Sequence, residues 1–216
     1  MLGGDAAAVA KLDEMFATPP VRPENPTANN DEGGLEGQFG QIGQYWHGNE
    51  PSHHIVYLYS VYGAPGKAAG LLSRIWRNCY RAARDGLCGN DDCGQMSAWY
   101  LFTAMGLYPL NPCGGEYVLG APQVEKVKIK LETRVGVREK TDKFHSPTQN
   151  SNSYYFSIIA KNLSNENKYV KSVMLNGKPV TDWKIRHADV MRGGELVFEM
   201  AGCAASRPRS MKSGSR

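Results

Sequence analysis

The chain has 216 residues, and its 41% hydrophobic and 10% aromatic content is typical of a folded soluble protein and too apolar for a disordered one. The formal net charge of +4 comes largely from the serine-rich end, residues 204–216, and the lack of a basic stripe elsewhere argues against nucleic-acid binding. No apolar run approaches the roughly 20 residues that span a bilayer, and the first residues lack the basic start of a signal peptide.

Helical patterns dominate the first half of the chain. Residues 5–16, DAAAVAKLDEMF, carry apolar side chains at helical spacing, and TPPVRPENPTANNDEGG after them is a loop because of its prolines and asparagines. Further helices are predicted from Pro51 to Gly63 and from Pro65 to about residue 83. The segment QMSAWYLFTAMGLYP is apolar on nearly every side, so we expect a buried inner helix there.

The second half of the chain has the alternating pattern of β-strands. EYVLG, VEKVKIKLE, YYFSIIAKN, YVKSVMLNG and ELVFEM alternate polar with apolar or β-branched residues, and Asn176-Gly177 is a hairpin signal. We therefore expect an α + β fold, with helices in residues 1–112, an antiparallel β region in 113–203 and a flexible basic tail in 204–216.

The five cysteines predict neither a zinc site nor a full disulfide framework. They form no CxxC pair, and the stretch GNDD between Cys88 and Cys93 is a poor zinc spacing. An odd total argues against a complete set of disulfides. Ordinary thiols are the simpler interpretation, and the redox compartment stays open.

Two polar loops are predicted to meet at one end of the helices. Helices joined by a link as short as Gly63-Ala64 usually run antiparallel, so alternate helices run parallel and begin at the same end. One of these begins at HGNEP and the other at GNDDCGQ. The loops then gather amides, carboxylates and imidazoles, namely His47, Asn49, Glu50, His53, His54, Asn90, Asp91, Asp92 and Gln95.

Each carboxylate in these loops, taken alone, is explained by helix capping, since helix N-termini favour negative charge. Together, however, like charges brought close need a counter-ion or a raised pKa. Carboxylate, amide and carbonyl oxygens favour a hard cation such as Ca²⁺ over zinc, although GNDDCG lacks the ligand ladder of an EF-hand. His53 and His54 point about 100° apart on a helix, so at most one faces the loops.

Four aromatic residues near the loops offer flat apolar faces of the kind on which sugar rings stack. Trp99 and Tyr100 are expected in the core, within the inner helix, whereas Tyr45 and Trp46 stay open between core and ligand binding. Carboxylates, amides and an aromatic wall are typical of a carbohydrate site, and paired carboxylates hydrolyse glycosidic bonds.

These motifs resemble the C-terminal region of glycoside hydrolase family 92. The resemblance rests on GQYWHGNEPSHHIVYLY, GNDDCGQMSAWYLFTAMGLYPLNP, YVLGAP and NENKYVKSVMLNGKPV, with AKLDEMF at the start, in order over about residues 1–200. Members of the family are calcium-dependent exo-α-mannosidases that invert the anomeric configuration. They combine an N-terminal β-sandwich with an (α/α)₆ barrel, so the resemblance implies that residues 1–112 form the terminal helices of that barrel.

The resemblance implies a role for each candidate residue. Asp92 would be the general base that activates the attacking water, and the calcium ion would be held by Asn49, Glu50 and Asn90. The implied substrate-binding residues are Trp46, His53, His54, Asp91 and Gln95.

The sequence also departs from the family pattern. The general acid, a glutamate, lies upstream of the matching region, and Glu24, Glu32 and Glu36 lack the motif expected around it. Asn90 stands where some relatives carry an acid, and the stretch 132–153 is longer than the usual hairpin. We therefore expect a C-terminal fragment that contains the base without the acid.

The favoured function is that of a calcium-dependent inverting α-mannosidase, of the α-1,2 type, that trims mannose from glycans such as N-glycans. Its expected partners are mannose-containing glycans and the N-terminal part of the enzyme, with no nucleic acid and no membrane, and the resemblance implies a periplasmic or secreted protein. Two alternatives stay open: an inactive module that binds mannose or calcium, and a truncated product without a function.

Overall fold

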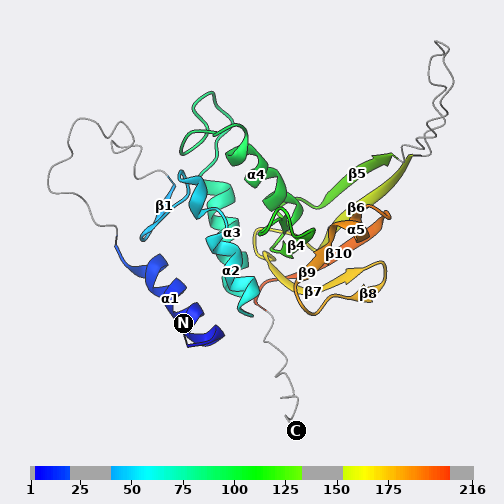
Figure 1. The fold of residues 1–216 in the computed structure, drawn as a ribbon, viewed down its shortest axis with the longest axis horizontal. Helices are drawn as coiled ribbons and strands as arrows, with labels where there is room; N and C mark the ends of the chain where they lie inside the picture. The colour runs from blue at the N-terminus through cyan, green and yellow to red at the C-terminus, as the bar shows by residue number, and fades with distance from the viewer. Residues whose placement is uncertain (1–2, 20–39, 133–152, 205–216) are drawn as a thin grey trace, which may run out of the picture.

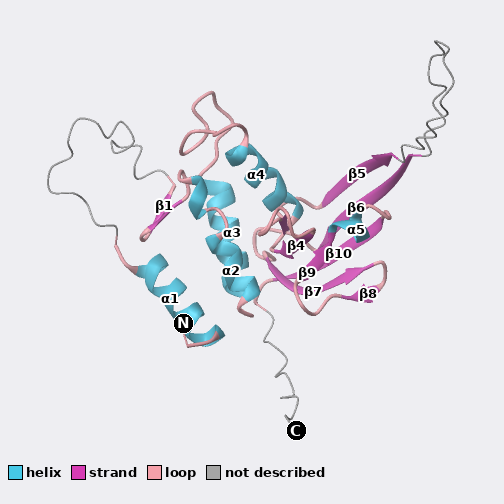
Figure 2. Cartoon of the chain, viewed as in Figure 1, coloured by secondary structure: helices cyan, strands magenta, loops and turns pink. Residues whose placement is uncertain are grey.

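The structure, a computed structural model, describes residues 3–19, 40–132 and 153–204. Most of the helices lie on one side of the molecule and the largest β-sheet on the other (Figure 1). Colouring by secondary structure shows the same division (Figure 2). The predicted α + β class is thereby confirmed. The three glutamates considered above as acids, most of the proline-rich loop and most of the tail lie outside the described residues.

The predicted helices are all present, with shifted ends. They are α1 (Asp5–Ala17), α2 (Ile55–Val61), α3 (Pro65–Asn78) and α4 (Gln95–Met105). The α2 helix begins later than predicted because Glu50–Ser52 forms a separate 3₁₀ turn, η2. The α3 helix ends earlier because Tyr80 leaves the helix and pairs with Leu87 in an antiparallel bridge. Among the described residues, no helix is long and apolar enough to cross a bilayer.

The helices pack around a core of apolar and aromatic side chains. The apolar stripe predicted on α3 is buried through Ala68, Leu72 and Ile75, and α1 packs Phe16 against the ring of Tyr45, with 5.1 Å between ring centroids. Further buried members of this cluster are Val56, Tyr57, Tyr59, Met96 and Trp99. Burial of such side chains is the main stabilising contribution to this half of the molecule.

The expectation that α4 is buried on all sides is wrong for the part of the chain that the structure describes. Met96, Trp99 and Thr103 face the core, but Leu101 on another side is 60% exposed. The apolar side chains of α4 could pack against neighbours on every side of the helix. In this structure only some of those sides contact another element.

The largest sheet has the strand order β5-β6-β10-β7-β8. Its strands are β5 (Lys126–Glu132), β6 (Ser153–Lys161), β7 (Tyr169–Leu175), β8 (Lys178–Pro179) and β10 (Gly194–Ala201). The pairing is antiparallel except that β10 runs parallel to β6. Since β10 lies between β6 and β7, which run in opposite directions, it must be parallel to one of them.

The hairpin predicted at Asn176-Gly177 is confirmed. These residues join β7 to β8 with φ angles of 49° and 77°, the left-handed pair that a two-residue turn of type I′ requires. The Asn176 side chain also accepts a hydrogen bond of 2.7 Å from the backbone N–H of Glu195, which ties the turn to β10.

Several short elements were not predicted, since so few residues carry no periodicity. They are the hairpin β1 (Gln41–Ile42) with β2 (Tyr45–Trp46), the strands β3 (Leu107–Tyr108) and β9 (Lys184–Arg186), and the turn of helix α5 (His187–Val190). β3 and β9 pair with the two sides of β4 (Glu116–Leu119), the strand predicted from EYVLG. The β3–β4 pair contributes side chains to both the helical core and the sheet core. The domain boundary near residue 113 falls between these paired strands and stays a prediction.

Candidate functional site

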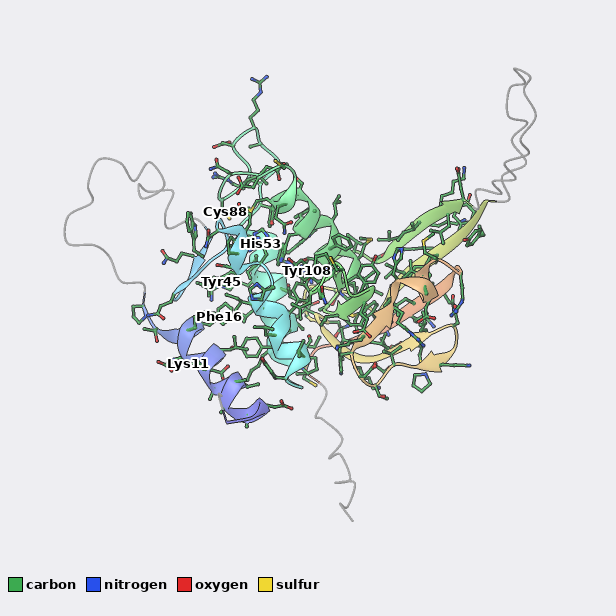
Figure 3. The ribbon with its side chains drawn as sticks, viewed as in Figure 1. Lys11, Phe16, Tyr45, His53, Cys88 and Tyr108 are labelled. Carbon is green, nitrogen blue, oxygen red and sulfur yellow. The ribbon has the colours of Figure 1, made fainter. Side chains whose placement is uncertain are left out.

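The two polar loops meet at one end of the helices, as predicted. We call residues 47–54 the first loop and residues 88–95 the second loop. Gly48 of the first loop and Gly89 of the second pack backbone against backbone, so closely that a methyl group on either would overlap the other loop. A hydrogen bond of 3.2 Å joins Gln95 Nε2 to His53 Nδ1, and Figure 3 shows Cys88 and His53 at the same end of the helices.

His47 is buried among tyrosines in this region. Its Nδ1 lies 2.7 Å from the Tyr45 hydroxyl and its Nε2 lies 2.7 Å from the Tyr80 hydroxyl. Because Tyr80 donates its own proton to the Met96 carbonyl at 3.1 Å, Nε2 is the nitrogen of His47 that donates. Burial, with a smaller effect of the neighbouring His53, holds the pKa of His47 well below its usual value, so the ring is neutral.

His53 is 0% exposed and is also held as a neutral ring. Its Nε2 donates to the His47 carbonyl at 3.0 Å, which leaves Nδ1 to accept from the Gln95 amide. Burial lowers the pKa of His53, against the opposing effect of that backbone hydrogen bond. The backbone carbonyl of His53 accepts from Trp99 Nε1 at 3.1 Å. His53 therefore links the first loop, the second loop and the α4 helix.

His54 diverges from its neighbour, as the helical geometry predicts. It is exposed at the start of α2, whereas His53 points inward. Gln95 is partly buried at the first position of α4, where its amide contacts His53. The substrate-binding roles of His53, His54 and Gln95 stay predictions.

Asp91 caps the N-terminus of α4. One oxygen of its carboxylate accepts hydrogen bonds of 2.9 Å from both the backbone N–H and the hydroxyl of Ser97. Its carbonyl accepts from the N–H groups of Gly94 and Met96. These bonds satisfy donors that the first turn of a helix otherwise leaves without partners. The capping interpretation thus accounts for Asp91, and its contact with substrate stays a prediction.

We expect Asp91→Ala to lower the free energy of unfolding by about 0.5–2 kcal/mol, the usual cost of removing a cap. Urea denaturation of the variant measures this loss. Asp85→Ala is the matched control, because Asp85 is 83% exposed and makes only a surface ion pair with Arg81, of little value for stability. An unchanged urea midpoint for Asp91→Ala would show that the cap contributes nothing.

Asp92 differs from Asp91 in both backbone and exposure. Asp92, Cys93 and Gly94 form a left-handed run, with φ angles of 45°, 58° and 95°. Left-handed backbone costs a non-glycine residue roughly 1–2 kcal/mol, and residues held there are enriched at functional sites. The run leaves Asp92 exposed at the mouth of the second loop.

The predicted calcium ligands flank the contact between the loops. Asn49 follows Gly48, and Asn90 follows Gly89, and both asparagine side chains are exposed. Because the two glycines are in contact, the two side-chain amides branch from neighbouring stretches of backbone. Glu50 is partly buried at the first position of η2. Amide and carboxylate oxygens are ligands that Ca²⁺ prefers, but it takes six to eight of them. No group of three or more His, Cys, Asp or Glu in the described parts could hold a metal, so these residues fit part of a calcium shell.

The aromatic residues divide between core and surface. Tyr45 and Trp99 are fully buried in the core. Tyr100 is partly buried and stacks on Trp76, with 4.8 Å between ring centroids. Trp46 is also partly buried, and its Nε1 donor is shielded from solvent with no hydrogen-bond partner among the described residues.

The tyrosine contacts of His47 were not found from the sequence. Tyr80 lies 33 residues away from His47 and directly after a helix, so no local pattern joins them. The contact with Tyr45 could have been predicted. Tyr45 and His47 are two residues apart in a strand-like stretch, which places both side chains on one face.

A family model of the glycosyl hydrolase family 92 catalytic domain matches residues 1–202. A curated relative, an uncharacterized secreted glycosidase of Arthroderma benhamiae, is 33% identical over 153 residues, which are 71% of this chain and 18% of that protein. Among solved structures, a family GH92 α-mannosidase from Bacteroides thetaiotaomicron is 31% identical with a TM-score of 0.71, over 96% of this chain and 24% of that one. A family GH92 inverting mannosidase from the same species is 30% identical with a TM-score of 0.68, over 94% and 25% of the two chains.

The chain thus spans at most about a quarter of the length of these relatives. The solved structures cover nearly all of it in the same fold, which agrees with the predicted place at the C-terminal side of the enzyme. Because the family model also matches almost the whole chain, the chain belongs to glycosyl hydrolase family 92.

Proposed function

We propose that this chain forms one wall of an inverting α-mannosidase active site, with Asp92 as the general base and a partial calcium shell beside it. The observation that carries the proposal is the backbone contact between Gly48 and Gly89, which sets Asn49 and Glu50 next to the loop of Asp92. Family membership and the solved relatives, one of them named an inverting mannosidase, support the reaction class.

Asp92 is suited to the role of base because, of the adjacent residues Asp91 and Asp92, it is the one with an exposed carboxylate. Inverting glycosidases use one carboxylate to deprotonate a water that attacks the anomeric carbon, while an acid on the opposite face protonates the leaving oxygen. The two carboxyl groups stand about 6.5–9.5 Å apart to leave room for that water. One oxygen of the Asp91 carboxylate is instead engaged by Ser97 at the start of α4. The general acid would come from a segment outside the motifs of this chain.

Asn49, Glu50 and Asn90 would hold the calcium ion, with the remaining oxygens supplied by backbone carbonyls, water or sugar. When bound, the ion supplies positive charge that orients and polarises hydroxyl groups of the sugar. Trp46, which is partly buried and directly precedes the first loop, would contribute its ring to the sugar site. His53 and Gln95 would act mainly by fixing the two loops through their mutual hydrogen bond.

The proposed substrates are mannose-containing glycans, N-glycans included, with terminal α-1,2 linkages as the first class to test. A secreted or periplasmic setting accords with the relative that is named a secreted glycosidase. Because the matching enzymes are about four times longer than the matched region, the rest of the substrate pocket would come from their other segments.

Calcium is expected to raise the thermal midpoint of the chain. A ligand that binds only the folded state adds about 2.7 kcal/mol at one hundred times its Kd, which is several degrees for a protein of this size. Melts in calcium and in a chelator measure the shift. Glu50→Ala should remove it, whereas Glu116→Ala, an exposed residue of β4, should keep it. A midpoint indifferent to calcium, or a full shift in Glu50→Ala, would contradict the proposed ligands.

A second candidate is a module that binds mannose or calcium without turnover. It differs from the first candidate in having no general acid, and a base alone does not complete the inverting reaction. Hydrolysis of an α-mannoside by the chain would exclude this candidate. A mannose-induced rise of the thermal midpoint without product would support it.

A further inference from the structure

Two buried cysteines face one another where the second loop leaves the end of α3. The helix ends at Asn78, with Cys79 as its C-cap, and the chain then turns back on itself. Tyr80 and Leu87 form an antiparallel bridge, and the N–H of Arg81 donates to the carbonyl of Gly86 at 2.8 Å. In an antiparallel pairing the next residues outward are also opposite one another. Those residues are Cys79 and Cys88.

Both side chains belong to the same buried cluster, and the residues are only 2% and 6% exposed. Each thiol also shifts the pKa of the other, down for Cys79 and up for Cys88, which is expected only of near neighbours. Residues directly opposite across an antiparallel pair have Cβ atoms about 4.5–5.5 Å apart. A disulfide needs about 3.5–4.5 Å, so a small movement of the backbone brings Cys79 and Cys88 into bonding geometry. We propose that Cys79 and Cys88 form a disulfide that fastens the second loop to the end of α3.

The other cysteines lack this arrangement. Cys93, Cys113 and Cys203 are exposed and lie in the second loop, in the turn between β3 and β4, and after β10 respectively. One disulfide and three remaining thiols account for all five cysteines. The odd number of cysteines excludes only a structure in which every cysteine is paired.

The proposed bond forms by thiol–disulfide exchange with a small-molecule disulfide such as oxidised glutathione. One cysteine sulfur attacks the disulfide, releases one thiol and becomes a mixed disulfide. The second cysteine sulfur attacks the mixed disulfide and releases the second thiol. The two cysteines lose two protons and two electrons in all, and the glutathione disulfide takes them up as it is reduced to two thiols. Since both cysteines are buried, we expect the bond to form while the chain folds.

A bond at this position would stabilise the junction of the two loops. The sulfur of Cys88 lies against Gly40, and its carbonyl lies against Gly48 of the first loop. Fixing Cys88 to the α3 helix therefore fixes the place where the second loop meets the first. The inference rests on the bridge and on the shared burial of the two cysteines, and it holds whether or not the chain hydrolyses mannosides.

Counting free thiols tests the bond directly. The chain is refolded in a mixture of reduced and oxidised glutathione, denatured at low pH and alkylated with N-ethylmaleimide, and its mass is measured. The five cysteines of the reduced chain should all take the label, and the oxidised chain should take three, with a cross-linked peptide that joins Cys79 to Cys88. Five labels after oxidation, or a link between other cysteines, would overturn the proposal.

Two variants sharpen this measurement. Cys93→Ser removes an exposed thiol, so its oxidised form should still contain the bond and take two labels. Cys79→Ser should take four labels under both conditions. Labelling reads the bond after denaturation, so the result does not depend on how well Cys79→Ser folds. The oxidised wild type should also melt about 5 °C or more above the reduced one, and equal midpoints would contradict the stabilising role.

Discussion

Asp92→Asn is expected to lower kcat for an α-mannoside by about 10²- to 10⁴-fold, the usual contribution of a positioned general base. The assay needs the protein that contains this chain together with its general acid. The amide has the size of the carboxylate but cannot take a proton from water. Because the Asp92 side chain is exposed and makes no bond in the α4 cap, the substitution should leave folding and sugar binding intact. Steady-state kinetics give kcat, and calorimetry with a mannose ligand gives Kd.

Azide makes this test specific for the base. Azide attacks without losing a proton, so it should restore turnover in Asp92→Asn and give the glycosyl azide of inverted configuration. Asp85→Asn is the control, since this exposed residue lies outside the second loop and should keep the wild-type kcat. A variant Asp92→Asn with the wild-type kcat would exclude Asp92 as the base. A weaker Kd with unchanged kcat would instead make it a substrate ligand.

Much of the fold could be predicted because its elements are long enough to show a period. The stripe of α3 and the alternation of β5 and β6 each repeat several times, and the structure buries or half-buries the side chains that the pattern selects. The meeting of the two loops followed from a single short link. Gly63, with φ of 75°, turns the chain between α2 and α3. A link this short forces the two helices to run in opposite directions, whatever residues it contains.

Features that depend on long-range contacts could not be predicted in this way. β10 lies between β6 and β7. Its alternating pattern would equally suit an edge of the sheet or a place between two other strands, so the sequence does not select its neighbours. The exposure of Leu101 is a similar case, because the hydrophobicity of α4 does not say which of its sides meets a neighbour.

The adjacent acids of the second loop show the same limit at the site. Asp91 and Asp92 are chemically identical and consecutive, and helix capping and catalysis both favour acids at a helix start. Their conformations separate them: the Asp91 carboxylate accepts from Ser97, whereas Asp92 has a left-handed φ of 45° and is exposed. A dihedral angle of this kind is set by the packing of the loops and has no signature in the local sequence.

Gly89→Ala should separate the two loops and so disable the site without changing any polar group. The added methyl group would overlap the carbonyl of Gly48, and backbone cannot rotate away as a flexible side chain can. We expect the free energy of unfolding to fall by about 1–3 kcal/mol, the usual cost of overpacking. The calcium-induced rise of the midpoint should be lost as well, since Asn49 and Asn90 start from these backbones. Urea denaturation and calcium titration measure the two effects.

Gly70→Ala is the matched control for this substitution. Gly70 lies within α3, where an added Cβ would meet only the Tyr169 hydroxyl at an ordinary 3.8 Å. Alanine should raise stability there by roughly 0.5–1 kcal/mol, because glycine is a poor helix residue, and should leave the calcium response unchanged. Gly48→Ala disrupts the same contact from the other loop, so the double variant Gly48→Ala/Gly89→Ala should lose less stability than the sum of the single losses. Additive losses would mean that the loops do not touch at this point, and the calcium shell proposed around their contact would have no basis.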